Sequence, residues 1–180
     1  MKPQTNIALR PIETEDLDLL VAWRNHPEVA TEFFNVFPLS RAGQSDWFES
    51  YLQRNDEQLF IIVQANGKPI GTVGLSNIDF KNQKAEFGRL LIGPPEYRGK
   101  GYGKQATLLT LSLGFAELNL NKIYLHVFAD NKHAVSLYSS CGFIEEGVFR
   151  EEHFSRGAWR DVARMSVLRR EYSRMMQDEV

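Results

Sequence analysis

Apolar and polar positions follow short strand-like runs through the middle of the chain. These runs predict strands at 59–65, 69–78 and 85–92, with an earlier short strand at 7–10. The dipeptide Asn66-Gly67 stands between two of these runs and favours a tight hairpin turn, because both residue types tolerate a positive φ. The pattern therefore predicts an antiparallel meander.

Two early segments carry helical periodicity instead. Thr14 is the expected N-cap of the first helix, with Glu15 and Asp16 in its first turn, and Pro27 ends that helix. Ser40 is the expected cap of a second helix, whose apolar side carries Trp47, Phe48, Tyr51 and Leu52.

The second half of the chain alternates between the two kinds of element. It predicts helices at 103–118 and 131–140, and strands at 122–128, 143–150 and 161–169. A meander that runs into a βαβ unit predicts an α/β fold with a mixed sheet and flanking helices. The chain has 180 residues, of which 43% are hydrophobic, and it contains no repeat or linker. We therefore expect a single domain over residues 1–180.

Composition narrows the classes of function. The formal net charge is −2 and basic runs are short, which excludes bulk electrostatic binding to nucleic acid. We find no apolar stretch of membrane-spanning length and no apolar leader, so we expect no membrane partner and a cytoplasmic location. The single Cys141 and the spacing of the four histidines predict no disulfide and no metal site.

A glycine-rich segment joins the strand 85–92 to the helix 103–118. It reads Glu-Tyr-Arg-Gly-Lys-Gly-Tyr-Gly from 96 to 103. Free N–H groups and the helix dipole form an anion site at such a turn, and Arg98, Lys100 and Lys104 add positive charge. The glycine spacing fits neither the dinucleotide-binding pattern nor the Walker pattern. We therefore predict a phosphate ligand of another kind.

Two motifs resemble those of one enzyme superfamily. Arg98-x-x-Gly101-x-Gly103 resembles the pyrophosphate-binding signature of the GNAT superfamily of acyl-CoA-dependent N-acetyltransferases. The segment 131–143 is similar to a second GNAT segment, through its Asn131, Tyr138 and following Gly-Phe pair. The predicted order of elements also resembles the GNAT fold.

This resemblance implies acetyl-CoA as cosubstrate. In that fold the strand before the glycine turn splays from its parallel neighbour, here 123–128, and pantetheine lies between the two. The residues that the resemblance places on the cofactor are Leu91, Ile92, Arg98, Gly99, Lys100, Gly101, Tyr102, Gly103, Lys104, Asn131 and Ser136.

The resemblance also implies roles in acetyl transfer to an amine. Tyr138 is the candidate acid for the leaving thiolate, and its alternative is a half-buried core residue. Glu86 is the candidate base for the amine proton. The alternatives to Glu86 are a water relay, or a purely solvent-facing role for this residue. A backbone N–H of Leu91 or Ile92 is expected to meet the oxyanion.

The acceptor is left open by the sequence. The expected acceptor-binding residues are Trp23, Asn25, Glu28 and Glu32. The chain resembles spermidine N-acetyltransferases and ribosomal-protein N-terminal acetyltransferases alike, but Asn35 and Val36 replace the adjacent glutamates of the polyamine type. The segment 23–27 is similar to enzymes that acetylate amino sugars. We expect a small amine, polyamine or amino sugar, with a protein N-terminus or a non-catalytic acyl-CoA module as alternatives, and the pattern leaves room for a homodimer.

Overall fold

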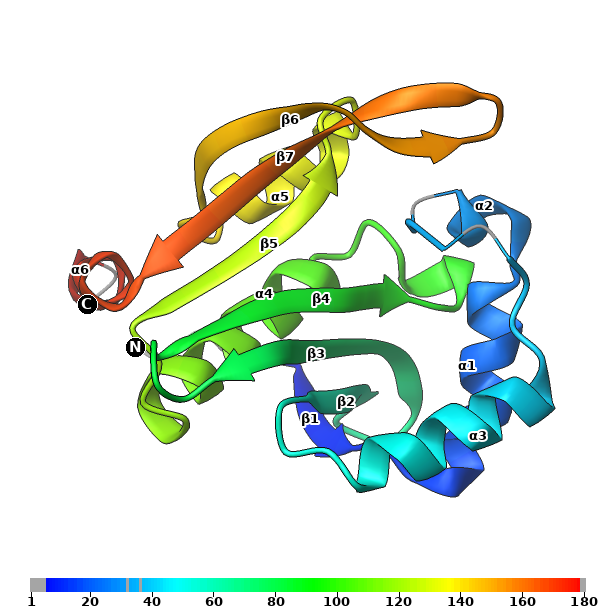
Figure 1. Cartoon of the computed structure of the whole chain (residues 1–180). Helices are drawn as coiled ribbons and strands as arrows, with labels where there is room; N and C mark the ends of the chain where they lie inside the picture. The colour runs from blue at the N-terminus through cyan, green and yellow to red at the C-terminus, as the bar shows by residue number, and fades with distance from the viewer. Residues whose placement is uncertain (1–5, 32, 36, 179–180) are drawn as a thin grey trace.

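Seven strands form one mixed sheet in the computed structural model, which describes residues 6–31, 33–35 and 37–178 (Figure 1). The order across the sheet is β1-β2-β3-β4-β5-β7-β6. The mixed α/β fold predicted from the sequence is confirmed. The strands are β1 (Ile7–Pro11), β2 (Gln58–Gln64), β3 (Pro69–Asp79), β4 (Lys84–Ile92), β5 (Lys122–Phe128), β6 (Ile144–Ser155) and β7 (Ala158–Leu168).

Helices flank this sheet. They are α1 (Leu17–Arg24), α2 (Pro27–Ala30), α3 (Arg41–Leu52), α4 (Tyr102–Ser112), α5 (Lys132–Ser139) and α6 (Arg169–Asp178). Short 3₁₀ turns at Thr14–Asp16 and Pro95–Tyr97 precede α1 and α4, and α4 continues into a π-helical segment, Leu113–Glu117. The sequence did not predict α2 or α6. Among the described residues no helix has both the length and the apolar character that a bilayer crossing requires.

Strand β2 has helices on both of its faces, which is why its sequence is continuously apolar. Leu59, Ile61 and Val63 pack in a cluster with side chains of α1 and α3. Phe60 and Ile62 point the other way, into the main core that α4 completes. The period-two alternation of a strand thus divides the apolar side chains between two cores.

Two local predictions about the early helices were wrong and one was confirmed. Thr14 does not cap the first helix, because it lies inside a 3₁₀ turn whose N-cap is Glu13, and the Asp16 carboxylate accepts the N–H of Glu13 at 2.9 Å to complete the capping box of that turn. Ser40 does cap α3, with the N–H of Gly43 donating to its Oγ at 3.0 Å. Leu52, expected on the apolar side of α3, is 61% exposed at the end of that helix.

Strands β4 and β5 are paired in parallel over a short length only. Their register runs from Lys84 beside Lys122 to Glu86 beside Tyr124. Beyond Glu86 the two strands diverge, and β4 stays paired with β3 alone (Figure 1). The last residues of β4 therefore present a free backbone edge toward β5.

A β-bulge at Arg89 changes the course of β4 beside this opening. Arg89 has a φ of 55°, which is rare for a residue with a side chain. The register of β3 and β4 shifts between Thr72 and Gly74, and the Thr72 hydroxyl donates to the Arg89 carbonyl at 2.7 Å. The bulge turns the backbone and side chains of the second half of β4 relative to the first half.

Candidate active site

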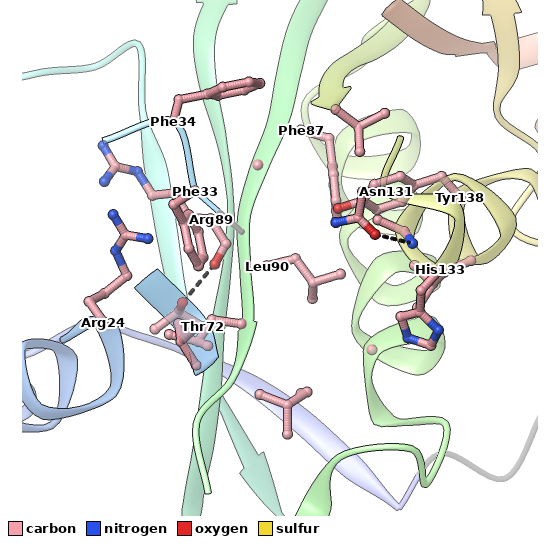
Figure 2. Close-up of a pocket in the computed structure, with 18 of the residues that line it drawn as sticks. Arg24, Phe33, Phe34, Thr72, Phe87, Arg89, Leu90, Asn131, His133 and Tyr138 are labelled. Carbon is pink, nitrogen blue, oxygen red and sulfur yellow. Dashed lines mark hydrogen bonds between the residues drawn. The ribbon is translucent and has the colours of Figure 1, made fainter. Parts of the chain in front are cut away.

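A cavity of about 910 Å³ lies where β4 leaves β5. Residues between 20 and 138 line it, because α1, α2, β3, β4, β5, the glycine turn, α4 and α5 all reach it. Figure 2 shows two groups of residues across the strand β4. Arg24, Phe33, Phe34 and Arg89 lie on one side, and Asn131, His133 and Tyr138 lie on the other.

The glycine turn lines one end of the cavity with open backbone. Gly99 and Gly101 have φ values of 71° and 81°, and Gly101 is the N-cap of α4. A Cβ built on either glycine would meet no atom within 4 Å, so their conformation rather than crowding requires glycine. The first N–H groups of α4 have no partner within the helix, and the turn exposes them to a ligand. This geometry suits a diphosphate.

The basic side chains near the turn do not all face a ligand. Lys100 and Lys104 are exposed, and Lys104 lines the cavity. Arg98 folds back instead: it donates to the carbonyls of Ile92 and Gly93 at 3.1 and 2.6 Å. Its Nη1 also donates to Glu28 at 2.7 Å. Arg98 therefore ties the turn to the end of β4 and to α2.

Other residues predicted to bind the cofactor lie around this turn. Tyr102 accepts a hydrogen bond from Gln64 at 3.1 Å, and its ring packs edge-on against Tyr97. Leu91 and Ile92 pair with Thr72 and Gly71 on β3, which leaves their other edge toward β5. Two of the predicted cofactor residues do not line the cavity. They are Ser136, which is exposed on α5, and Lys100, which is exposed in the glycine turn.

Tyr138 reaches the cavity from α5. The Asn131 side chain caps this helix by accepting the N–H of Ala134 at 3.0 Å. The Tyr138 ring packs edge-on against Phe87 and Phe143, with centroid separations of 5.8 and 5.9 Å. Burial raises the pKa of Tyr138 well above its ordinary value, because the phenolate is poorly solvated there. The phenol therefore stays protonated and able to donate at neutral pH.

Glu86 belongs to a small polar group at the point where β4 and β5 separate. Its Oε1 lies 2.9 Å from Nδ1 of His126, and its Oε2 accepts a hydrogen bond from Asn77 at 2.8 Å. Glu86 and His126 line the main cavity and also a smaller adjoining one of about 310 Å³. The sequence analysis did not select His126, whose only signal was its alternate position on the predicted strand 122–128.

The four predicted acceptor residues lie in different surroundings. Glu28 lines the cavity. Trp23 is buried against Gly93, where an added Cβ would lie 2.3 Å from its ring, and it does not line the cavity. Asn25 exchanges two hydrogen bonds with the backbone of Leu39, at 2.8 and 2.7 Å, and also lies outside the cavity. Glu32 falls outside the described residues.

The structure brings other residues to the acceptor side. Arg24 and Arg89 line the cavity, together with Phe33 and Phe34. Arg24 follows Trp23 directly in the chain, but one position along a helix turns a side chain by about 100°. That rotation sends Trp23 into the core and Arg24 into the cavity. Among the described residues, no three His, Cys, Asp or Glu side chains form a group suited to a metal ion.

The fold and this cavity agree with the comparisons to known proteins. The chain belongs to the GNAT acetyltransferase family, whose domain matches residues 6–144. It is 34% identical to the spermidine N(1)-acetyltransferase of Vibrio cholerae over 168 residues, which covers 93% of this chain and 96% of that protein. It is 33% identical to the spermidine N(1)-acetyltransferase of Escherichia coli K12, with coverages of 93% and 88%.

A solved structure extends the likeness to three dimensions. The crystal structure of the Vibrio cholerae spermidine N-acetyltransferase with CoA and spermine superposes with a TM-score of 0.87 at 34% identity, covering 93% of this chain and 98% of that one. The chain is an acetyl-CoA-dependent N-acetyltransferase. The individual site residues and the single domain over 1–180 stay predictions.

Proposed function

We propose that this enzyme moves an acetyl group from acetyl-CoA directly to a primary amine of a small molecule, with both substrates bound together. The observation that carries the proposal is that Tyr138 and the Glu86–His126 pair line one cavity. The similarity to spermidine N(1)-acetyltransferases supports a small amine such as a polyamine as acceptor, and the amino sugar stays a prediction from the sequence. The cytoplasmic location and the homodimer stay predictions.

Acetyl-CoA would enter along the opening between β4 and β5. The N–H groups from Gly99 to Lys104 hold the diphosphate, and the exposed Lys100 and Lys104 add positive charge. The pantetheine arm pairs with the free edge of β4 at Leu91 and Ile92. This arrangement brings the thioester between the acid and the base.

Tyr138 serves as the acid. The amine nitrogen attacks the thioester carbon, a tetrahedral intermediate forms, and the carbon–sulfur bond then breaks. The electron pair of that bond leaves on sulfur, and Tyr138 donates its proton to the thiolate. The raised pKa of Tyr138 keeps the phenol protonated at neutral pH, so that it can hydrogen-bond to the sulfur as negative charge develops there. A backbone N–H of Leu91 or Ile92 stabilises the oxyanion.

The Glu86–His126 pair takes the proton from the amine. An alkylamine has a pKa of about 10 and attacks only when it is neutral. A carboxylate bonded to Nδ1 favours the tautomer that carries its proton there, so Nε2 of His126 is left as an acceptor. The pair thus supplies a base at the point where β4 separates from β5, beside the proposed position of the thioester.

The cysteine of this chain is not placed to form a covalent acetyl-enzyme. Cys141 is the only cysteine of the chain, it is fully buried, and it does not line the described cavity. Burial also raises the pKa of its thiol. Direct transfer within a ternary complex therefore fits the site.

Initial-velocity kinetics tests this function. Release of CoA thiol is measured while acetyl-CoA and a panel of polyamines, amino sugars and N-terminal peptides are varied. We expect acetylated small amines by mass spectrometry and intersecting double-reciprocal lines. Parallel lines contradict direct transfer, and CoA binding without turnover on any amine contradicts the proposed function.

A further inference from the structure

The guanidinium of Arg24 is a half-buried cation on the acceptor side of the cavity. Arg24 ends α1 and lies on the opposite side of β4 from Tyr138 (Figure 2). Its guanidinium carbon lies 3.6 Å from the centroid of the Phe33 ring. Its Nη1 is buried and has no hydrogen-bond partner among the residues that the structure describes. The site therefore holds a positive charge with unused donors.

The carboxylates near Arg24 are engaged elsewhere. Arg89 pairs with Glu57 at 2.5 Å, and Glu57 also faces Arg54 at 3.5 Å. In the cavity lining, Glu28 pairs with Arg98 and Glu86 pairs with His126. Within the described ranges, no ion pair joins Arg24 to a carboxylate, so among these residues its charge has no acidic partner.

Holding this charge without a partner has a cost in free energy. Burial lowers the pKa of Arg24 to about 10, and the nearby charge of Arg89 lowers it as well. The guanidinium is still charged at neutral pH. An anion placed against it compensates for the water contacts that the guanidinium has lost. The planar fork of an arginine matches carboxylate and phosphate oxygens. The second ammonium group of a polyamine, placed there, would instead be repelled by the guanidinium.

We infer that the acceptor is a primary amine that also carries a carboxylate or phosphate, with its anion held by Arg24 and Arg89 and its amine at Glu86. This inference rests on the proposed function. Glu86 and Arg89 stand three residues apart on β4, which corresponds to at most about 10 Å along the strand, because the bulge at Arg89 shortens the rise of a regular strand. The amine and the anion of the acceptor are therefore separated by several bonds. A linear polyamine of that length fits this end of the cavity less well.

Four amines of matched length test the inference on the wild-type enzyme. They are 6-aminohexanoate, 6-aminohexyl phosphate, hexane-1,6-diamine and hexylamine, and kcat/KM is measured for each with saturating acetyl-CoA. We expect at least one of the two anionic amines to exceed the diamine by tenfold or more, and the better of the two identifies the anion. Turnover of the diamine equal to or above both anionic amines overturns the inference but leaves the proposed function standing. Absence of turnover with all four amines also overturns the inference, while the proposed function is then decided by the wider panel of polyamines, amino sugars and N-terminal peptides.

Variants of Arg24 test the residue itself. Arg24→Met lowers the ratio of kcat/KM for the anionic amine to that for hexylamine by tenfold or more, and Arg24→Lys, which keeps the charge but loses the planar fork, gives an intermediate ratio. Arg156→Met is the matched control, because Arg156 is exposed at the β6–β7 turn and lies outside the cavity. An unchanged ratio in Arg24→Met overturns the assignment. The wild-type series decides the question by itself if Arg24→Met does not fold.

Discussion

Nδ1 of His126 lies 2.9 Å from a carboxylate oxygen of Glu86, although the two residues are 40 positions apart in the chain. They meet where β4 and β5 separate, because the parallel pairing of these strands ends with Glu86 beside Tyr124. Asn77 on β3 holds the second carboxylate oxygen at 2.8 Å. Three neighbouring strands thus fix the orientation of one proton-accepting pair.

Removing this base is the first prediction. Glu86→Gln keeps the shape of the side chain but loses its charge, so kcat/KM is expected to fall about 100-fold. His126→Gln produces a similar loss, and the double variant falls little further because the two residues act as one unit. Losses that multiply in the double variant contradict a shared role. Glu117→Gln, at an exposed position on the π-helical segment, is the control.

The sequence predicted one member of this pair and missed the other for a physical reason. Glu86 could be selected because strand alternation turned it away from the buried Ala85 and Phe87. His126 occupies an equally regular position on β5. Its importance depends on the register between β4 and β5, and on the point at which they separate. Neither property is encoded in the local pattern of one strand.

The second prediction concerns the glycine turn. Gly101→Glu places a carboxylate where the diphosphate is held, so the affinity for acetyl-CoA is expected to fall more than 100-fold by calorimetry. Gly67→Glu is the matched control, because both glycines have a φ of 81° and open space around a built Cβ. The backbone strain is therefore similar in the two variants. Equal affinities in the two variants contradict a diphosphate site at Gly101.

The third prediction isolates the phenol of Tyr138. Tyr138→Phe keeps the ring contacts with Phe87 and Phe143 and removes only the hydroxyl. We expect kcat to fall between 10- and 100-fold at roughly constant KM for acetyl-CoA, because proton donation is needed in the transition state. Steady-state kinetics measures both constants. A rise in KM with kcat unchanged assigns Tyr138 to cofactor binding instead of catalysis.

The fourth prediction concerns stability and acid. The Asp16 carboxylate is buried and bonded to Arg10 at 2.7 Å. Burial alone acts to raise the pKa of Asp16, but the hydrogen bonds from Arg10 and from the Glu13 N–H outweigh it and hold the pKa below its ordinary value. Asp16→Asn is expected to reduce the free energy of unfolding by about 2 kcal/mol at pH 7.

The direction of the pH effect follows from that lowered pKa. The stabilisation by Asp16 is present above the ordinary carboxyl pKa of about 4 and is lost as the pH falls through the lower pKa of the folded state. Urea unfolding at several pH values should therefore show wild type and Asp16→Asn converging in acid. Asp56→Asn, in the exposed pair with Arg54, should change stability little at any pH. A constant difference between wild type and Asp16→Asn down to acid pH contradicts the assignment.

The acceptor side marks the limit of what the sequence alone could predict. Asn25 and Trp23 were selected because the segment 23–27 is similar to enzymes that acetylate amino sugars. In the structure the Asn25 side chain forms hydrogen bonds with the backbone of Leu39, and Trp23 packs against Gly93. Arg24 and Arg89 line the cavity instead. Arg24 depends on the rotation of a short helix and Arg89 on a bulge, and both are consequences of tertiary packing.

A structure of the enzyme with CoA is the most direct test of the central claim. We expect CoA density in the cavity between β4 and β5, with the diphosphate on the backbone N–H groups of residues 99–104. The sulfur is expected within hydrogen-bonding reach of the Tyr138 hydroxyl. Density for CoA elsewhere, with the glycine turn free of the diphosphate, would contradict a cofactor site at this turn.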